Sequence, residues 1–482
     1  MAKITPSPGN SIAVVIRYNQ NDGSLTKIID TIEANNASLG PIEILESERT
    51  TVVREFAINL TKPEEGQPLV DKISEIEGVE VLEAWDRTFD MHVGGKIDVV
   101  SKSPLNDTDD LSMAYTPGVA RICKAIEADP QKAFEYTIRQ NTVAVITDGT
   151  AVLGLGDIGA TAGLPVMEGK AVLFKEFGGV NAFPICVNTK DPDELLATCK
   201  NIIGTFGGVN LEDIAAPRCF DLERELQKVA DIPIFHDDQH GTATVCAAGI
   251  INALKVTGKD PSKLRLVVSG AGAAAMACTR AILDLGVGDA ILCDRKGAIY
   301  DGREDLVPGN PKFNKSKYWA SKVFNKTNMK GSLKDVLKGA DIFLGLSGPN
   351  LLTGEDIRTM NADPIIFAMS NPTPEVPLEE CYGYASVVAS GRSDYPNQVN
   401  NVLCFPGLFK GLLESGAKMV TREMQKAAAN AIANCIENPT ADNVIPNAFQ
   451  PGVADAVAEA VKKCVEDPNI SQTPIFFDFD KF

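Results

Sequence analysis

The segment that decides the fold reads LRLVVSGAGAAA at residues 264–275. Its first half is an apolar run that predicts a strand, and a helix is expected to follow through about Leu285. The pattern G-x-G-x-x-A between them gives a tight turn, lets a pyrophosphate approach the backbone, and keeps the helix close to the strand. Free N–H groups at the helix start then face the phosphates. The residues expected to bind a dinucleotide are Gly270, Ala271, Gly272, Ala273, Ala274 and Ala275.

The next apolar strand, Asp289–Cys293, ends at Asp294. An acid about 20 residues after the glycines accepts the ribose 2′-OH of NAD in such folds, so Asp294 favours NAD. Arg295 and Lys296 follow directly and could instead hold the 2′-phosphate of NADP. Glycines at an ordinary strand–helix turn would be a simpler explanation, but strand, turn, helix and acid all occur in order. We therefore predict a Rossmann-type NAD(P)-binding domain over residues 241–482.

Upstream, strands such as Thr142–Thr147, Ala182–Val187 and Ile232–Phe235 alternate with helical segments, which indicates parallel βαβ units over residues 95–240. Two acidic pairs follow apolar or loop segments of this region, Glu212-Asp213 and Asp237-Asp238. Hard cations prefer oxygen ligands, so the pairs indicate Mg²⁺ or Mn²⁺. From their spacing alone, two solvated acidic turns are equally acceptable. His236 and His240 beside the second pair are more simply explained as structural histidines than as zinc ligands.

Residues 1–94 show a different order of predicted strands and helices. Strands at Ser11–Arg17, Ile42–Ser47, Thr51–Leu60 and Val79–Trp85 are separated by two amphipathic helices, near residues 25–32 and at Leu69–Ile76. The order β-α-β-β-α-β predicts a ferredoxin-like domain. It offers no glycine-rich phosphate loop, so a regulatory or packing module is favoured over a second catalytic site.

Composition limits the class of protein. The 482 residues exceed one compact core and fit about three domains. A net charge of −18 argues against a nucleic-acid partner, because phosphate binding needs clustered Lys and Arg. Residues 1–10 show no secretory apolar run, and no stretch has the length of a membrane helix. The 11 cysteines form no C-x-x-C pair and are expected to be reduced, which together predicts a cytoplasmic protein.

Several further motifs decide the function class. They are AYTPGVA at 114–120, GLPVMEGK at 163–170, SNPTPE at 370–375, and GRSD at 391–394 followed by Asn400-Asn401. With the two acidic pairs, these segments resemble, in order, the tyrosine, lysine, metal and asparagine motifs of malic enzymes of the short prokaryotic type. The resemblance covers about Gly94 to the last helix. The first ~90 residues look like the ACT domain that some of these enzymes carry.

The resemblance implies a role for each matching residue. Glu212, Asp213 and Asp238 would bind the metal, Lys170 would be the general base, and Tyr115 the general acid. Asp237 would orient Lys170 or a ligand. Asn371 and Asn401 would contact substrate or nicotinamide, with Asn400 close by. The chain departs from the larger animal enzymes at residues 154–159, GLGDIG, where an arginine that binds a substrate carboxylate is missing.

The implied reaction is oxidation and decarboxylation of L-malate to pyruvate with reduction of NAD, or of NADP. The resemblance also implies a homodimer, in which Tyr115 could act across the interface, and a small-molecule effector at the ACT-like domain. A malolactic-type enzyme shares these motifs and returns the hydride to give lactate. A non-catalytic sensor that carries an ACT domain and a metal-free 2-hydroxy-acid dehydrogenase are the remaining hypotheses.

Overall fold

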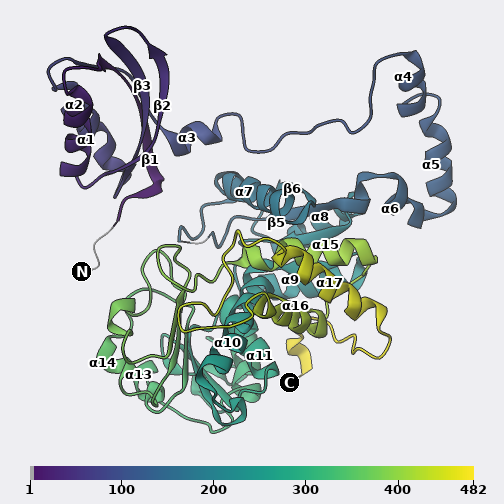
Figure 1. The fold of residues 1–482 in the computed structure, drawn as a ribbon. Helices are drawn as coiled ribbons and strands as arrows, with labels where there is room; N and C mark the ends of the chain where they lie inside the picture. The colour runs from purple at the N-terminus through teal and green to yellow at the C-terminus, as the bar shows by residue number, and fades with distance from the viewer. Residues whose placement is uncertain (1–4, 153, 482) are drawn as a thin grey trace. The chain divides into compact units, whose positions relative to one another are not determined.

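The computed structural model describes residues 5–152 and 154–481 of the chain (Figure 1). Residues 1–4 of the expected N-terminal domain, and Phe482, lie outside the described residues. The chain divides into two compact units, Met1–Val99 and Val100–Phe482. Among the described residues no helix combines the length and the apolar character that crossing a bilayer requires.

The N-terminal unit is one antiparallel sheet in the order β2-β3-β1-β4, with two helices in its chain order β-α-β-β-α-β. Its strands are β1 (Ser7–Asn19), β2 (Ser38–Ser47), β3 (Thr51–Leu60) and β4 (Val79–Asp86). Its helices are α1 (Ser24–Ala34) and α2 (Gly66–Ser74), and the short α3 (Arg87–His92) follows β4. Apolar side chains such as Ile28, Ile32 and Ile73 form its core with β1 and β3. All four predicted strands and both predicted helices are confirmed, with ends shifted by a few residues.

The second unit begins with three helices, α4 (Thr108–Ala114), α5 (Val119–Ala128) and α6 (Ala133–Tyr136). A four-stranded parallel sheet follows in the order β6-β5-β7-β8. Its strands are β5 (Thr142–Thr147), β6 (Asn181–Cys186), β7 (Gly208–Leu211) and β8 (Ile234–His236). Its helices are α7 (Ala160–Gly178), α8 (Pro192–Ile202) and α9 (Arg218–Val229). The strand order reverses between β5 and β7, and such a switch point is where open α/β sheets bind ligands.

A second sheet has six strands in the order β11-β10-β9-β12-β13-β14, parallel except for β11. Its strands are β9 (Arg265–Ser269), β10 (Asp289–Asp294), β11 (Gly297–Ala298), β12 (Ile342–Gly345), β13 (Ile365–Ala368) and β14 (Val387–Ser390). Its helices are α10 (Thr242–Thr257), α11 (Ala273–Asp284), α12 (Lys315–Val323), α13 (Leu333–Leu337) and α14 (Gly354–Ile357). The order reverses at β9 and β12, which is the arrangement of a Rossmann-type fold and confirms the predicted fold class of this part of the chain.

The chain ends with three helices that lie beside one another in Figure 1, α15 (Phe405–Ser415), α16 (Arg422–Asn434) and α17 (Val453–Glu466). Helix α15 packs against α7 of the first sheet. The ring of Phe174 on α7 lies 4.7 Å from that of Phe405 and 5.3 Å from that of Phe409. These aromatic contacts fix α7 against α15, and from α7 the Lys170 side chain reaches the residues that follow β7 and β8.

Candidate active site

Acidic side chains gather where the parallel strands of the first sheet end. Leu211, the last residue of β7, pairs with Ile146 of β5 and with His236, the last residue of β8. This register brings the residues that follow β7 and β8 to one edge of the sheet. The two acidic pairs, far apart in sequence, therefore meet there, and solvated turns on separate surfaces are excluded.

Glu212, Asp213 and Asp238 form a tight group of carboxylates at this edge. One oxygen from each lies within 4.8 Å of the other two. Asp213 adopts a left-handed backbone conformation with φ +54°, and its N–H donates to Asp238 Oδ2 at 2.8 Å. Three carboxylate oxygens so close together repel one another unless a cation lies between them. The donor set fits Mg²⁺ or Mn²⁺, which take oxygen ligands and keep positions for water or substrate.

Lys170 on α7 reaches this group from the side. Its residue is only 8% exposed, and its Nζ lies 2.5 Å from Asp237 Oδ2 and 2.9 Å from Glu212 Oε1. The ammonium also lies 4.1 Å from the centre of the Phe405 ring. Lysine side chains usually project into water, so a buried lysine paired with carboxylates is a candidate functional residue.

The acid and base groups of the site shift one another's pKa. Burial alone would lower the pKa of Lys170, but the carboxylates of Asp237 and Glu212 outweigh it and raise the pKa above its ordinary value. Burial raises the pKa of the Glu212 carboxyl, and Lys170 offsets only part of that increase. The neighbouring carboxylates cause the shift at Lys170, whereas burial is the largest cause of the shift at Glu212 and the aspartates add to it. A divalent cation at the group would lower both pKa values.

Asp237 is fully buried and joins Lys170 to the C-terminal part of the chain. Asn401 Nδ2 donates to Asp237 Oδ2 at 3.0 Å, and Asn401 Oδ1 accepts from Thr242 Oγ1 at 3.2 Å. Gly241 makes room for this carboxylate, because a Cβ there would lie 1.8 Å from Asp237 Oδ1. Asp237 and Asn401 thus fix the direction in which Lys170 points.

Three other predicted site residues are placed differently. Tyr115 directly follows helix α4 and is 68% exposed, and no hydrogen bond in the described part of the chain joins it to Lys170. Asn371 is exposed in the loop after β13. Asn400 caps the short turn Asn401–Leu403 by accepting from Val402 N at 3.0 Å. The structure therefore brings Lys170, Asp237, Asn401 and the three carboxylates together, and leaves Tyr115 and Asn371 outside their contacts.

The glycine-rich turn lines a hollow of about 840 Å³ at the ends of β9, β10 and β12. Gly270 has φ +126°, and a Cβ there would lie 2.6 Å from the carbonyl oxygen of Leu346. Gly272 has open space where a side chain would stand and precedes α11 directly. Gly270, Ala271, Gly272 and Asp294 line the hollow, which fits a dinucleotide with its pyrophosphate at the start of α11.

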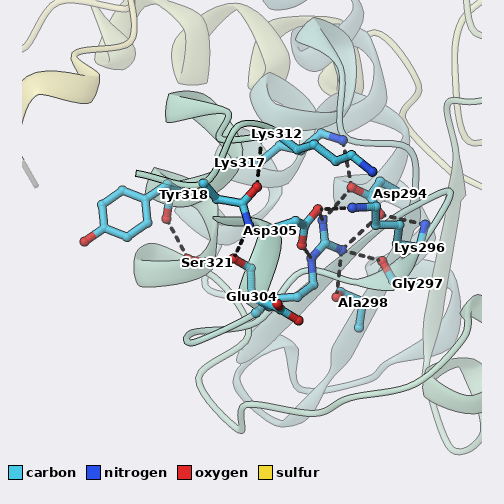
Figure 2. A network of polar contacts seen from close by, with 12 residues as sticks. Asp294, Lys296, Gly297, Ala298, Glu304, Asp305, Lys312, Lys317, Tyr318 and Ser321 are labelled. Atoms are coloured by element: carbon cyan, nitrogen blue, oxygen red, sulfur yellow. Dashed lines mark hydrogen bonds and ion pairs between the residues drawn. The ribbon is translucent and has the colours of Figure 1, made fainter. Parts of the chain in front are cut away.

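Asp294 sits in an ion cluster that sequence reasoning missed (Figure 2). Arg303 donates to both of its carboxylate oxygens, at 2.9 and 2.7 Å, and Lys317 Nζ donates to Oδ2 at 2.7 Å. Burial opposes ionisation, but the hydrogen bonds from Arg303 and Lys317 hold the pKa of Asp294 well below its usual range. Both cations come from the segment after β11, and no motif in that segment signals them.

Comparison with known proteins identifies the family. Residues 94–227 match the family model described as malic enzyme, N-terminal domain, and residues 239–466 match malic enzyme, NAD binding domain. The chain is 47% identical over 449 residues to the NAD-dependent malic enzyme of Geobacillus stearothermophilus, covering 92% of each chain. This chain belongs to the malic enzyme family.

Two further malic enzyme relatives agree. A protein of Bacillus subtilis (strain 168) named bifunctional malic/malolactic enzyme is 51% identical over 384 residues, covering 79% of this chain and 92% of its own. The crystal structure of the NAD-dependent malic enzyme of Thermotoga maritima superposes with a TM-score of 0.75 at 42% identity, over 78% of this chain and 99% of that one. The malic enzyme fold thus accounts for the second unit, including both sheets.

Proposed function

We propose that this chain oxidises and decarboxylates L-malate to pyruvate and CO₂ while it reduces a nicotinamide dinucleotide, NAD or NADP. The observation that carries the proposal is the position of Lys170 Nζ, 2.9 Å from Glu212 in a group of three carboxylates, in a chain of the malic enzyme family. The dinucleotide hollow on the second sheet supplies the site for the hydride acceptor.

Glu212, Asp213 and Asp238 would hold Mg²⁺ or Mn²⁺. When bound, the cation would make the C2 hydroxyl of malate more acidic and withdraw electrons from the carbonyl formed from it. Lys170 must be neutral to accept a proton, and a positive charge at these carboxylates would favour that form. The surplus of carboxylates over ammonium groups at this edge supports a bound cation.

Lys170 takes the proton of the C2 hydroxyl as the C2 hydride passes to the nicotinamide, which leaves oxaloacetate. The C3–C4 bond then breaks, CO₂ departs, and its electron pair remains as an enolate. Tyr115 protonates C3 to give pyruvate, and the Lys170 ammonium returns to Tyr115 the proton that it took from the C2 hydroxyl. Asp237 holds Lys170 by accepting a hydrogen bond from its Nζ, and Asn401 holds Asp237 by donating to the same carboxylate oxygen.

Mixing L-malate, Mn²⁺ and either NAD or NADP with the protein tests this function. We expect reduced nicotinamide to appear with an equal amount of pyruvate. A malolactic-type activity is the second candidate, favoured by the similarity to the bifunctional Bacillus subtilis relative. It would give lactate without net reduction of added dinucleotide. Formation of neither pyruvate nor lactate would contradict both functions.

We further propose that the chain works as a homodimer in which Tyr115 reaches the Lys170 of the second copy. Helices α4 and α5 carry Leu111, Met113 and Ile122, and Tyr115 lies between the two helices. All four apolar side chains are exposed in the single chain. Exposed apolar groups on adjacent elements mark a surface that a partner covers. Within the part of the chain that the structure describes, Tyr115 has no hydrogen bond to Lys170 of its own chain. If the partner is another copy of this chain, Tyr115 can instead lie beside Lys170 of that copy.

Complementation tests this arrangement. Tyr115→Phe and Lys170→Ala chains are each expected to be nearly inactive, whereas dimers re-formed from an equal mixture should regain about a quarter of wild-type turnover. Half of the re-formed dimers are hybrids, and each hybrid has one site with both intact residues. A mixture no more active than its components, with hybrid dimers present by mass spectrometry, would place Tyr115 and Lys170 in the same chain.

For the N-terminal unit we propose an ACT-like regulatory module that binds a small-molecule effector. The order β-α-β-β-α-β and the antiparallel sheet β2-β3-β1-β4 support it. Strand β2 leaves Ile44 and Leu45 exposed, a surface for a ligand or for a second module. We propose domain boundaries at residues 1–94, 95–240 and 241–482. We also propose that the enzyme works in the cytoplasm.

A further inference from the structure

One buried carboxylate holds both ends of the turn that carries Asp237 and Asp238. Glu223 lies on α9, and its side chain is only 1% exposed. Its Oε1 accepts from the backbone N of His236, the last residue of β8, at 3.1 Å, and its Oε2 accepts from His240 Nε2 at 2.9 Å. His236 directly precedes the acidic pair and His240 follows it by two residues, so a single side chain spans the pair.

The chain between these two bonds is a π-helical turn, Asp237–Gly241. Turns of this kind are rare, and they occur mostly as single turns, frequently at functional sites. The carbonyl of His240 accepts from Thr244 Oγ1 at 2.6 Å and from Gln425 Nε2 at 3.1 Å. These bonds fix the end of the turn, whereas Glu223 also fixes its beginning.

The ring of His240 is held by its surroundings. It is fully buried and contacts two aromatic rings, stacked on Phe477 with ring centres 6.3 Å apart and tilted against Phe235 with centres 5.7 Å apart. Its Nε2 is bonded to Glu223, and its Nδ1 has no hydrogen-bond partner in the ranges that the structure describes. The two rings therefore restrain the plane of the imidazole, and Glu223 sets the direction of its N–H.

Glu223 reaches the acid and base groups of the site through this turn. Asp237 Oδ2 accepts from Lys170 Nζ at 2.5 Å, and Asp238 Oδ2 accepts from Asp213 N at 2.8 Å. No hydrogen bond or ion pair of the described residues joins Glu223 itself to Lys170 or to the carboxylate group. A displacement of the turn would move both aspartates at once, and a misplacement of about 1 Å can cost about a hundredfold in rate.

We propose that Glu223 and His240 are positioning residues. They hold the turn so that Asp238 faces the cation site and Asp237 faces Lys170. The carboxylate is needed because it accepts from two N–H groups that would otherwise be buried and unpaired, which is costly. The inference deepens the proposed function and rests on it, since the same acidic pair is assigned there to the cation and to Lys170.

Mn²⁺ binding followed by electron paramagnetic resonance tests the proposal without malate or dinucleotide. Glu223→Leu removes both acceptors and keeps an apolar group in their place. His240→Phe keeps a ring beside Phe477 and removes the N–H donor. Glu225→Gln is the matched control, because Glu225 lies on the same helix and pairs with Lys228 at the protein surface.

We expect Glu223→Leu and His240→Phe each to weaken Mn²⁺ binding by about 10–100-fold, the usual cost of losing a residue that supports a metal ligand. Because Asp237 moves with Asp238, kcat should stay at least about tenfold below the wild-type value even at saturating Mn²⁺. Glu223→Gln keeps one acceptor and should recover most of the Mn²⁺ affinity. Glu225→Gln should match the wild type.

A role in stability alone gives a different result. Folded Glu223→Leu and His240→Phe proteins would then melt at a lower temperature but bind Mn²⁺ and turn over malate as the wild type does, which would overturn the proposal. If Glu223→Leu does not fold, His240→Phe decides, since it leaves the bond from His236 N to Glu223 in place.

Amide hydrogen exchange of residues 236–242 separates this inference from the proposed function. In Glu223→Leu this segment should exchange at least about tenfold faster than in Glu225→Gln, because two of its hydrogen bonds are lost. If the wild-type protein binds no Mn²⁺, the proposed reaction fails, and the exchange rates still decide whether Glu223 holds the turn. If malate is oxidised but neither exchange nor Mn²⁺ affinity changes in the variants, the reaction stands and Glu223 and His240 are not positioning residues.

Discussion

Replacing Lys170 with alanine is expected to lower kcat for malate oxidation by about 10³-fold or more, in the range of a lost acid–base group. The reason is geometric, because Lys170 Nζ is held at 2.5 Å from Asp237 and 2.9 Å from Glu212, at the place where malate would bind. Initial rates with saturating L-malate, Mn²⁺ and NAD measure the loss. Dinucleotide affinity should stay near that of the wild type, since Lys170 does not line the hollow of the second sheet.

Lys170→Ala leaves Asp237 buried without its ammonium, which costs about 3–5 kcal/mol when a buried pair is broken. Thermal unfolding must therefore show that the variant is folded at the assay temperature. Lys175→Ala on the same helix is the control, because Lys175 is bonded to Asn181 in an exposed pair and should retain full turnover. A folded Lys170→Ala protein that turns over malate at the wild-type rate would remove Lys170 from the reaction.

The second large effect is expected at the carboxylate group. Losing a residue that only hydrogen-bonds to a metal ligand weakens metal binding by about 10–100-fold. Glu212→Gln and Asp238→Asn each remove a direct ligand, so each should weaken Mn²⁺ binding by more than that. Turnover should fall at low Mn²⁺ and recover in part as Mn²⁺ is raised. Mn²⁺ titrations followed by electron paramagnetic resonance measure affinity without turnover.

Asp193→Asn, an exposed acid at the start of α8, is the control and should bind Mn²⁺ as the wild type does. Exhaustive chelation should abolish turnover of the wild-type protein. Full activity after chelation would favour a metal-free 2-hydroxy-acid dehydrogenase instead.

The sequence predicted the elements whose pattern is local. Thr51–Leu60 and Thr142–Thr147 match their strands residue for residue, since both are short apolar runs with clear ends. The glycine turn at Gly270 was predictable because its spacing is fixed by the pyrophosphate. The two acidic pairs could be joined only through the resemblance, because their meeting depends on the register of β7 with β8.

Other features depend on tertiary contacts. From its residue type alone, Lys170 would be predicted to lie on the surface. Its burial arises from the packing of α7 on α15. Arg303 and Lys317 lie 9 and 23 residues beyond Asp294, in a segment with no motif, so their ion pairs were not predictable. Tyr115 is exposed and has no hydrogen bond to Lys170 among the described residues; the second copy that we propose would bring a tyrosine to the site.

The most direct test of the central claim, that three carboxylates beside Lys170 hold the catalytic cation, is an anomalous difference map from a crystal of the protein grown with Mn²⁺. We predict one strong peak with oxygens of Glu212, Asp213 and Asp238 at about 2.2 Å and Lys170 Nζ close by. A well-ordered peak bound elsewhere, with this carboxylate group unoccupied in a crystal that turns over malate, would contradict the account.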